Sequence, residues 1–590
     1  MTTAALLAAA VQFEPLFGAR EANITRLLTL VEQAARQGAK LITTPEMATT
    51  GYCWYHRQEI AGQVETVPGP TTGRFAALAA RYQCYIVLGM PEVEAGTGLY
   101  YNSAVLIGPD GIVGCHRKSH PYISEPKWAA AGERHQVFDT PLGRIGMLIC
   151  MDIHYVETAR LLALAGADII CHISNWLAER TPAPYWISRA MENGCYLLES
   201  NRWGLERGVQ FSGGSCIIAP DGEILATVDD GDGIAYASLD LVGHPRRVLG
   251  EPVFRQRRPE LYHGLLSDSF LWNPADFFTL YNHRPLPAGR QSIISVLQFD
   301  AGNDIAGNVA RMAALARQTI DQQGSELLVF PELAVTGYDA PEQRAIALES
   351  PLLRPLLQLA MTHRVWLAFG LAEQDGERRY NTLLLLGPEG VVGHYRQIHL
   401  PQAYRHWASA GDHWGVFDTA LGRLGLLLGH DALFPESARI LALEGCDVVA
   451  CAAALDGGFT GAHPGSRVGQ NYPIPTGADP LHWHLFRTRA GENNLYLAFA
   501  NRCHAEAQGG YSGVFGPDTF HFPRTEQLRW QDEGAATLTI DTRSLAGSGS
   551  PTNVVRRKDL VAMRQVHHYR PLLANDDAST RGTDAGPSGG

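Results

Sequence analysis

The stretch Pro141–Arg160, PLGRIGMLICMDIHYVETAR, shows most directly how this chain folds. A glycine-bearing turn leads into the apolar run Ile145–Ile149, which predicts a buried strand that ends at Cys150. The residues that follow repeat apolar positions at helical spacing. A strand that passes into a helix lifts the cysteine off the sheet edge and points the helix N-terminus at its sulfur, which favours the thiolate. The stretch predicts an α/β fold with a nucleophilic Cys150, and an inert buried cysteine is the alternative.

The same stretch occurs a second time further along the chain. Ala420–Arg439 reads ALGRLGLLLGHDALFPESAR, with Gly429 at the position of Cys150. Self-similarity over this distance indicates a duplicated domain. The sulfur is present in only one of the two copies.

A carboxylate recurs at the start of both copies. Val11–Tyr52 and Leu297–Tyr338 each read as strand, helix and strand, and the last strand runs into Pro-Glu at Glu46 and Glu332. The carboxyl edge of an α/β sheet is where such folds build their sites. We therefore expect Glu46 to lie at that edge, although a single loop glutamate is more often only solvated.

Two further positions differ between the copies. A strand, a Pro-Asp-Gly turn and a second strand lead to Lys118, and the matching strand of the second copy ends at Gln397. Glu125 follows in the first copy and Tyr404 takes its place in the second. Taken singly, each of these charges would be an ordinary surface residue.

The composition excludes several classes of protein. The chain has 590 residues, 45% of them hydrophobic and 18% charged, and a formal net charge of -12. This charge argues against nucleic acid or an anionic membrane as the partner. The ten cysteines contain no CxxC pair, so we expect no metal site and a reducing compartment, the cytoplasm. No stretch has the length of a membrane span.

The repeat and the composition together divide the chain into four parts. We expect a catalytic domain over residues 1–273, a linker over 274–290, a second domain over 291–573 and a disordered tail over 574–590. The second domain carries a Gly/Pro-rich insertion, Asp456–Pro480.

Glu46 in PEMATTGY, Lys118 in HRKSHP and Cys150 in LICMD, in this order, resemble the nitrilase (carbon–nitrogen hydrolase) superfamily. The resemblance covers nearly the whole chain, twice, and includes RAMENGCYLLESNR downstream of the cysteine. It implies an α/β fold of two tandem four-layer α-β-β-α sandwich domains, packed as an intrachain pseudo-dimer. It also implies a cofactor-independent hydrolase.

The chemistry of this family suits the residue types. Cleavage of an unactivated C–N bond needs a nucleophile, a proton carrier and a positive charge opposite the oxyanion. The resemblance implies that Cys150 forms a thioester, that Glu46 carries protons, and that Lys118 with the N–H of Met151 stabilises the oxyanion. Glu125 resembles the second glutamate of the family, which holds the lysine.

The substrate is expected to be a small amide or N-carbamoyl compound, because Met151-Asp152 is nearer to the amidase pattern than to the Trp-Glu of nitrilases. A nitrilase that makes an acid and ammonia is the alternative, and a binding or scaffold protein is the third hypothesis. The pocket is expected to be lined by residues beside the catalytic motifs: Tyr52, Trp54, Tyr122, Met151, Asn175 and Trp176.

The second domain is expected to be folded but inactive. Other chemistry based on Glu332, His430 and Asp431 is the alternative. The apolar helical stretches Tyr155–Ala165 and Phe434–Leu443 are expected to form the pseudo-dimer interface, with a larger homo-oligomer as the alternative. We also expect the insertion to reach the mouth of the first domain's pocket.

Overall fold

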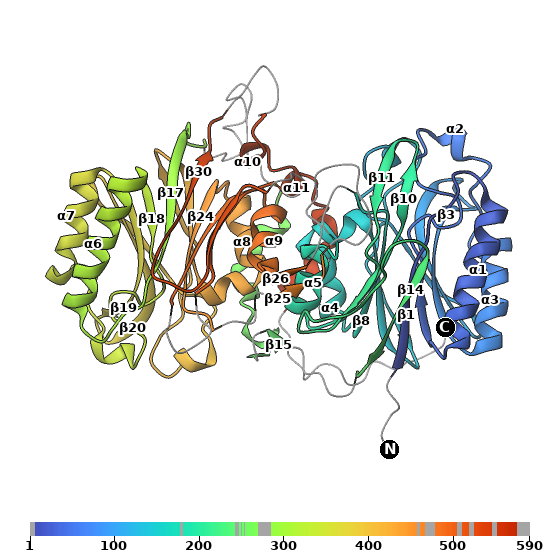
Figure 1. The fold of residues 1–590 in the computed structure, drawn as a ribbon, viewed down its shortest axis with the longest axis horizontal. Coiled ribbons are helices and arrows are strands. Elements are labelled where there is room, and N and C mark those ends of the chain that lie inside the picture. Colours follow the sequence, from blue (N-terminus) through green and yellow to red (C-terminus); the bar gives the residue numbers. More distant parts are fainter. Residues whose placement is uncertain are drawn as a thin grey trace, which may run out of the picture.

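A computed structural model of the chain describes residues 6–177, 181–241, 247–248, 251–252, 254–268, 285–456, 459, 461–465, 478–503, 510–518, 524–544 and 552–574. It contains two domains of the same architecture, which lie side by side along the longest axis of the molecule (Figure 1). The predicted duplication is therefore seen in the fold.

The first domain is built on two six-stranded sheets with the orders β14-β1-β2-β3-β4-β5 and β13-β12-β9-β8-β7-β6. The central strands of each sheet are parallel, and the strands toward the edges pair antiparallel. The strands of the first sheet are β1 (Leu6–Gln12), β2 (Leu41–Thr43), β3 (Tyr85–Val93), β4 (Tyr100–Gly108), β5 (Gly111–Arg117) and β14 (Gly233–Leu239). Those of the second are β6 (Val137–Thr140), β7 (Gly143–Ile149), β8 (Ile169–Ser174), β9 (Tyr196–Asn201), β12 (Cys216–Ile218) and β13 (Ile224–Thr227).

The second domain repeats this plan with the sheets β21-β20-β19-β18-β17-β30 and β22-β23-β24-β27-β28-β29. The first of these sheets contains β17 (Gln291–Gln298), β18 (Leu327–Val329), β19 (Trp366–Asp375), β20 (Arg378–Gly387), β21 (Gly390–Arg396) and β30 (Gly534–Asp541). The other contains β22 (Gly415–Thr419), β23 (Gly422–Leu428), β24 (Val448–Ala453), β27 (Tyr496–Asn501), β28 (Ser512–Phe515) and β29 (Glu526–Arg529).

The helices occupy two different environments. Helices α1 (Arg20–Arg36), α3 (Pro70–Tyr82), α6 (Ile305–Gln323) and α7 (Arg354–His363) lie at the two ends of the molecule (Figure 1). Each of these buries only one side, as an amphipathic surface helix does. Helices α4 (Val156–Leu164), α5 (Pro184–Asn193), α8 (Pro435–Leu443) and α9 (His484–Glu492) lie in the middle, where every residue of α5 and α9 is buried.

This burial follows from the way in which the domains meet. Helix α5 packs on α9, and Ser188 Oγ lies 3.0 Å from Thr488 Oγ1 across the contact. The layers therefore run α-β-β-α-α-β-β-α, which confirms the predicted tandem sandwiches and their packing as an intrachain pseudo-dimer. The predicted interface stretches correspond to α4 and α8.

The remaining elements are short. They are α2 (Arg57–Ile60), α10 (Val554–Arg557), α11 (Asp559–Ala562) and the strand pairs β10 (Trp203–Glu206) with β11 (Val209–Ser212), β15 (Arg247–Val248) with β16 (Glu251–Pro252), and β25 (Gly461–His463) with β26 (Asp479–His482).

Some predictions fall partly or wholly outside the described residues. These are the linker up to residue 284, most of the insertion Asp456–Pro480, and the tail from residue 575. The domain boundaries and the disordered tail stay predictions. Within the described part of the chain, no helix is both long and apolar enough to cross a membrane.

Candidate active site

Three strand ends bring the predicted catalytic residues of the first domain together. Glu46 follows β2, Lys118 follows β5 and Cys150 follows β7, so both sheets contribute. Their side chains are 0%, 1% and 8% exposed. Charges buried to this degree must be paired, and here they are paired with one another.

Lys118 lies between two carboxylates. Its Nζ donates to Glu46 Oε1 at 2.7 Å and to Glu125 Oε2 at 2.6 Å. Asn102, on β4, donates to both glutamates at 2.6 Å from the other side. Glu125, the least distinctive of the four in the sequence, is thus part of the cluster.

Two predicted pocket residues complete the hydrogen bonding of the glutamates. The backbone N–H of Asn175 donates to Glu46 Oε2 at 2.8 Å and its side-chain amide donates to the same oxygen at 3.0 Å. Tyr52 Oη donates to Glu125 Oε2 at 3.1 Å. Both carboxylates are therefore fixed in orientation before any substrate arrives.

Cys150 occupies a constrained turn. Its φ of 44° lies in the left-handed region, which non-glycine residues rarely adopt. A 3-10 turn, Cys150–His154, separates it from α4, so the N-terminus of that helix does not begin at the sulfur. Strain of this kind is often found at catalytic residues.

The expected thiolate is not what the site favours. Burial, followed by the negative charge of Glu46, raises the pKa of the Cys150 thiol well above its usual range, while Lys118 acts in the opposite direction. Burial also raises the pKa of Glu46. Burial alone would lower the pKa of Lys118, but Glu125 and Glu46 raise it well above normal. Burial therefore favours the neutral thiol of Cys150, while the neighbouring glutamates favour the ammonium form of Lys118.

The sequence of the chain matches the model of a known protein family. The model described as carbon-nitrogen hydrolase matches residues 7–244 and again residues 293–546. The chain belongs to the carbon–nitrogen hydrolase family. Glu46, Lys118, Glu125 and Cys150 lie within the first match.

Individual members of this carbon–nitrogen hydrolase family align with about one domain. A nitrilase of Pyrococcus abyssi is 35% identical over 43% of this chain and 97% of its own length. The omega-amidase NIT2 of Homo sapiens is 30% identical over 41% of this chain and 91% of its own. The crystal structure of a carbon–nitrogen hydrolase from Helicobacter pylori G27 aligns with 27% identity and a TM-score of 0.37 over 40% of this chain and 89% of that chain.

Asp152, two positions after Cys150 in this carbon–nitrogen hydrolase, has a structural task. Its Oδ1 accepts from Ser119 Oγ at 2.7 Å and from the backbone N–H of His120 at 2.9 Å, and its Oδ2 lies 3.0 Å from His116 Nε2. These contacts tie the cysteine turn to the end of the lysine strand. Asp152 is fully buried among these contacts.

The sequence analysis missed a buried polar group beneath the cysteine. His172 Nε2 lies 3.1 Å from the carbonyl oxygen of Cys150, and His172 Nδ1 contacts Glu199, which also accepts from Ser174. The second domain has Cys451, Phe499 and Ala453 at the equivalent strand positions of β24 and β27. Polar residues in one copy and apolar residues in the other were a signal that a comparison of the repeats could have used.

The other predicted pocket residues take different positions. Trp54 donates from Nε1 to the carbonyl of Gly51 at 2.9 Å and packs on Phe17, with 4.2 Å between ring centroids. Trp176 stacks on His154 at 4.7 Å. These contacts account for the burial of both tryptophans without a substrate.

Tyr122 and Met151 lie next to the cluster. The backbone N–H of Tyr122 donates to Glu125 Oε2 at 2.8 Å. Burial, and after it the proximity of Cys150, raises the pKa of Tyr122. Met151 follows Cys150 in the same 3-10 turn and is buried. Both residues are therefore placed to contact a molecule bound at the cysteine.

In the second domain, other side chains occupy the place of the Glu46, Lys118 and Cys150 cluster. Asn381 donates to Glu332 at 2.8 Å and to Gln397 at 2.9 Å, and Tyr404 bonds Glu332 in place of a cation. A Cβ at Gly429 would lie 2.7 Å from the Cβ of Ala453. The cluster thus keeps its shape but lacks the nucleophile, the cation and the space for a sulfur.

The alternative chemistry of the second domain finds no support in the contacts. His430 Nε2 is bonded to Gln256 Oε1 at 2.5 Å, and Asp431 is engaged by the N–H of His399 at 2.7 Å. Burial lowers the pKa of His430 to about 4. Neither residue contacts Glu332 among the hydrogen bonds of the described residues.

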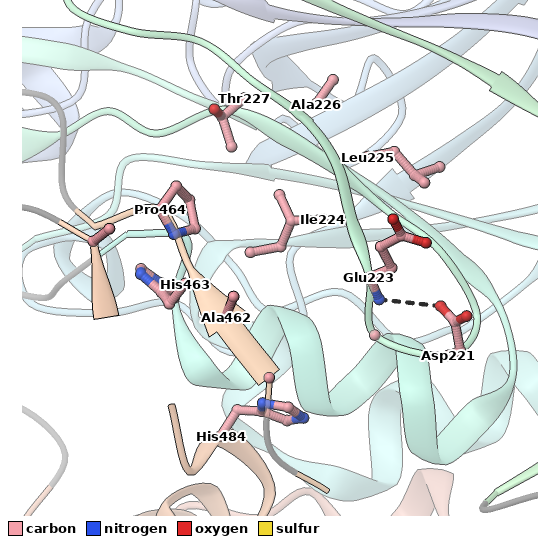
Figure 2. A pocket seen from close by; sticks show the side chains of 13 residues that line it. Asp221, Glu223, Ile224, Leu225, Ala226, Thr227, Ala462, His463, Pro464 and His484 are labelled. Carbon is pink, nitrogen blue, oxygen red and sulfur yellow. Dashed lines mark hydrogen bonds between the residues drawn. The ribbon is translucent and has the colours of Figure 1, made fainter. Parts of the chain in front are cut away.

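A separate cavity of about 840 Å³ lies where the domains meet. It is lined by the turn and strand Asp221–Thr227 of the first domain and by Gly461–Pro464, Ala478 and His484 of the second (Figure 2). None of the four catalytic candidates lines it. Within the described residues, no cluster of histidine, cysteine and carboxylate side chains is suited to hold a metal ion.

Proposed function

We propose that the first domain hydrolyses a small amide or N-carbamoyl compound through a thioester on Cys150. The observation that supports this most is the position of Lys118 between Glu46 and Glu125, next to the cysteine turn. A base, a fixed cation and a nucleophile at one buried point are what C–N cleavage requires. Membership of the carbon–nitrogen hydrolase family supports the same reaction class.

The acylation step uses these residues in sequence. Glu46 accepts the thiol proton while the sulfur attacks the carbonyl carbon, so a neutral resting thiol becomes nucleophilic only when substrate is in place. Lys118 and the backbone N–H of Met151 stabilise the negative oxygen of the tetrahedral intermediate. Glu46 then gives the proton to the leaving nitrogen as the C–N bond breaks. The acyl group remains on Cys150 as a thioester.

The deacylation step reverses the proton movements. Glu46, again a carboxylate, takes a proton from water as the water oxygen attacks the thioester carbon. The intermediate collapses, the C–S bond breaks and the thiol regains its proton. The amide hydrogen bonds from Asn175 and Asn102 hold Glu46 in one orientation throughout, because they leave its carboxylate little freedom to rotate.

A nitrile substrate is the second candidate, since the 35% identical relative from Pyrococcus abyssi is named a nitrilase. In that case the sulfur adds to the nitrile carbon and ammonia leaves after addition of water. The human relative is instead named an omega-amidase. The same residues can support attack of the sulfur on an amide or on a nitrile, so the geometry of the cluster does not distinguish these two substrates.

The test compares a panel of amides and N-carbamoyl compounds with a panel of nitriles, with ammonia or amine release as the readout. We expect release from the first panel, an acyl adduct on Cys150 by intact mass, and no release from Cys150→Ala. Release from nitriles alone would replace the proposal by the second candidate. A scaffold protein would release nothing from either panel and would form no acyl adduct on Cys150.

We further propose that the second domain is catalytically inactive and that the protein works in the cytoplasm. All ten cysteines, each in a described segment, are free thiols, which suits a reducing compartment. A homo-oligomer beyond the internal pseudo-dimer stays a prediction, tested by the mass of the purified chain in solution.

A further inference from the structure

Each domain ends in a segment that crosses to the other domain. Arg257, after the last sheet strand of the first domain, pairs with Glu436 on α8 at 3.0 Å. Arg564, after the last sheet strand of the second domain, pairs with Glu157 on α4 at 2.9 Å. The two exchanges are equivalent, so each domain is covered by a piece of its neighbour.

The segment of the second domain, residues 552–574, reaches the turn that carries the nucleophile. Leu560 forms a small buried apolar cluster with Met151 and Tyr155, and Tyr122 packs against this cluster. Met151 and Tyr122 are the two residues placed beside Cys150 in the active site. One wall of the site is therefore backed by a residue of the other domain.

The same segment also contacts the end of the lysine strand. The side-chain amide of Gln565 donates to the backbone carbonyl of Ser119, the residue after Lys118. In the reverse exchange, Arg258 donates to the carbonyl of Ile398, the residue after Gln397, at 3.3 Å. The crossing segments thus engage corresponding points of both domains, but only one of these points belongs to a site with a cysteine.

A charged residue of the same segment, Asp559, also acts electrostatically on the site. Burial, then Cys150 and then Asp559 raise the pKa of the Tyr122 hydroxyl. Asp559 is held in place by Arg557 through two contacts of 2.6 Å. This influence agrees with the packing of Leu560, the next residue, against the same wall.

We propose that the second domain, which has no nucleophile of its own, sets the substrate size accepted by the first domain, with Leu560 as the specificity-determining residue. This inference rests on the proposed hydrolytic function of Cys150. Leu560 acts through Met151 and Tyr122, which it holds in position.

The packing explains why this position controls size. Leu560 and Met151 are each 3% exposed and Tyr155 is fully buried, so the Met151 side chain has no room to retreat. Methionine is unbranched and adapts readily to new space. Loss of the leucine side chain would let Met151 move back and lengthen the pocket, whereas a larger side chain would press it forward.

The experiment measures kcat/KM of the full-length chain for unbranched aliphatic amides from acetamide to hexanamide. We expect Leu560→Ala to raise the ratio of hexanamide to propionamide by roughly tenfold, because a methylene in an apolar pocket is worth about that factor. Leu560→Phe should lower the same ratio. The two variants change the volume in opposite directions, so one of them remains informative if the other fails to fold.

Leu572→Ala is the matched control. Leu572 lies in the same crossing segment and is 1% exposed, but it is outside the cluster of Met151 and Tyr155. It should loosen the segment and leave the chain-length ratio unchanged. An equal shift in this control, or no shift in either folded Leu560 variant, would overturn the proposal.

A second readout separates this proposal from the proposed function. Alkylation of Cys150 by 2-chloroacetamide and by 2-chlorohexanamide, followed by intact mass, reports the size of the wall without turnover. If the native chain hydrolyses no amide but Leu560→Ala accelerates alkylation by 2-chlorohexanamide alone, the hydrolytic function is wrong and the proposed role of Leu560 is supported. If amides are hydrolysed but the Leu560 variants change neither the chain-length dependence of kcat/KM nor that of alkylation, the hydrolytic function is supported and the proposed role of Leu560 is wrong.

Discussion

Arg189 of the first domain and Glu492 of the second form an ion pair across the domain interface, with 2.7 Å between Nη2 and Oε2 and both side chains fully buried. The equivalent pair, Arg489 with Glu192, lies beside it at 2.6 Å, and each arginine also pairs within its own helix. The duplicated sequence thus produces a closed set of four charges. Such a set specifies one register of the two domains, because any other register would leave a charge buried without a partner.

Removal of one member of this set should destabilise the whole molecule. Arg189→Met leaves Glu192 and Glu492 with one cation between them, and we expect the free energy of unfolding to fall by about 3–5 kcal/mol. Urea denaturation measures the change. The double variant Arg189→Met/Glu492→Met should lose less than the sum of its single variants. Strict additivity of the two would show that the pair is not coupled.

Glu46→Gln and Glu332→Gln change equivalent residues, but only the first should affect hydrolysis. Glu46→Gln removes the proton carrier and should abolish hydrolysis, with a loss of several orders of magnitude in kcat. Glu332→Gln should leave hydrolysis unchanged, because the second domain has no nucleophile. A fall in activity with Glu332→Gln in a folded chain would argue that the second domain takes part in the chemistry.

The effect of Glu332→Gln on the free energy of unfolding should depend on pH. Burial raises the pKa of Glu332 from 4.5 to about 7 in the folded chain. The folded state therefore holds a proton that the unfolded state releases, so stability falls as the pH rises through this range. Glutamine mimics the protonated form and should stabilise the chain by up to about 3 kcal/mol at pH 8 and by almost nothing near pH 4. Equal effects at both pH values would contradict the assigned pKa.

Much of the fold and of the candidate catalytic cluster could be predicted because the sequence is duplicated, so that each half can be compared with the other. The repeat located the strand ends, and the differences at Cys150 and Lys118 distinguished the copy that carries the candidate nucleophile and cation from the copy that lacks them. The pKa of the Cys150 thiol could not be predicted from the local sequence. It depends on burial and on Glu46, which lies about a hundred positions away in the chain and close by in space, so local strand–helix geometry does not determine it.

The crossing segments and the support beneath the cysteine were missed for a different reason. The segment that carries Leu560 has no motif, and its neighbours Met151 and Tyr155 come from a distant part of the chain. His172 and Glu199 lie in apolar strands, where hydrophobic patterning draws attention to the residues around them. Only their replacement by Cys451 and Phe499 in the copy marks them as special.

His172 is expected to position the nucleophile. Its hydrogen bond to the Cys150 carbonyl supports a turn with left-handed backbone geometry. His172→Leu should lower kcat by roughly tenfold to a hundredfold with little change in KM, since a small displacement of a catalytic group has effects of this size. It should also slow alkylation of Cys150. Cys171→Ala, on the opposite face of the same strand, is the control and should change neither rate.

A sulfur alone should not revive the second domain. In a Cys150→Ala background, Gly429→Cys should release no ammonia from any substrate of the native chain. The new Cβ would lie 2.7 Å from the Ala453 Cβ and 2.9 Å from its Cα, and Gln397 supplies no positive charge for an oxyanion. Overpacking of this kind costs about 1–3 kcal/mol of stability. Measurable turnover in this variant would show that the filled site can open.

The first domain should not function alone. Residues 1–273 without the rest of the chain would expose α5, all of whose residues are buried in the full molecule, and would leave Arg189 and Glu157 without their partners in the second domain. They would also lack Leu560 behind Met151. We expect this fragment to be poorly soluble or weakly active, and addition of the second half, residues 285–590, should restore hydrolysis. Gel filtration and amide turnover measure both properties. A fragment that is monomeric, stable and as active as the whole chain would show that the second domain neither supports nor completes the site.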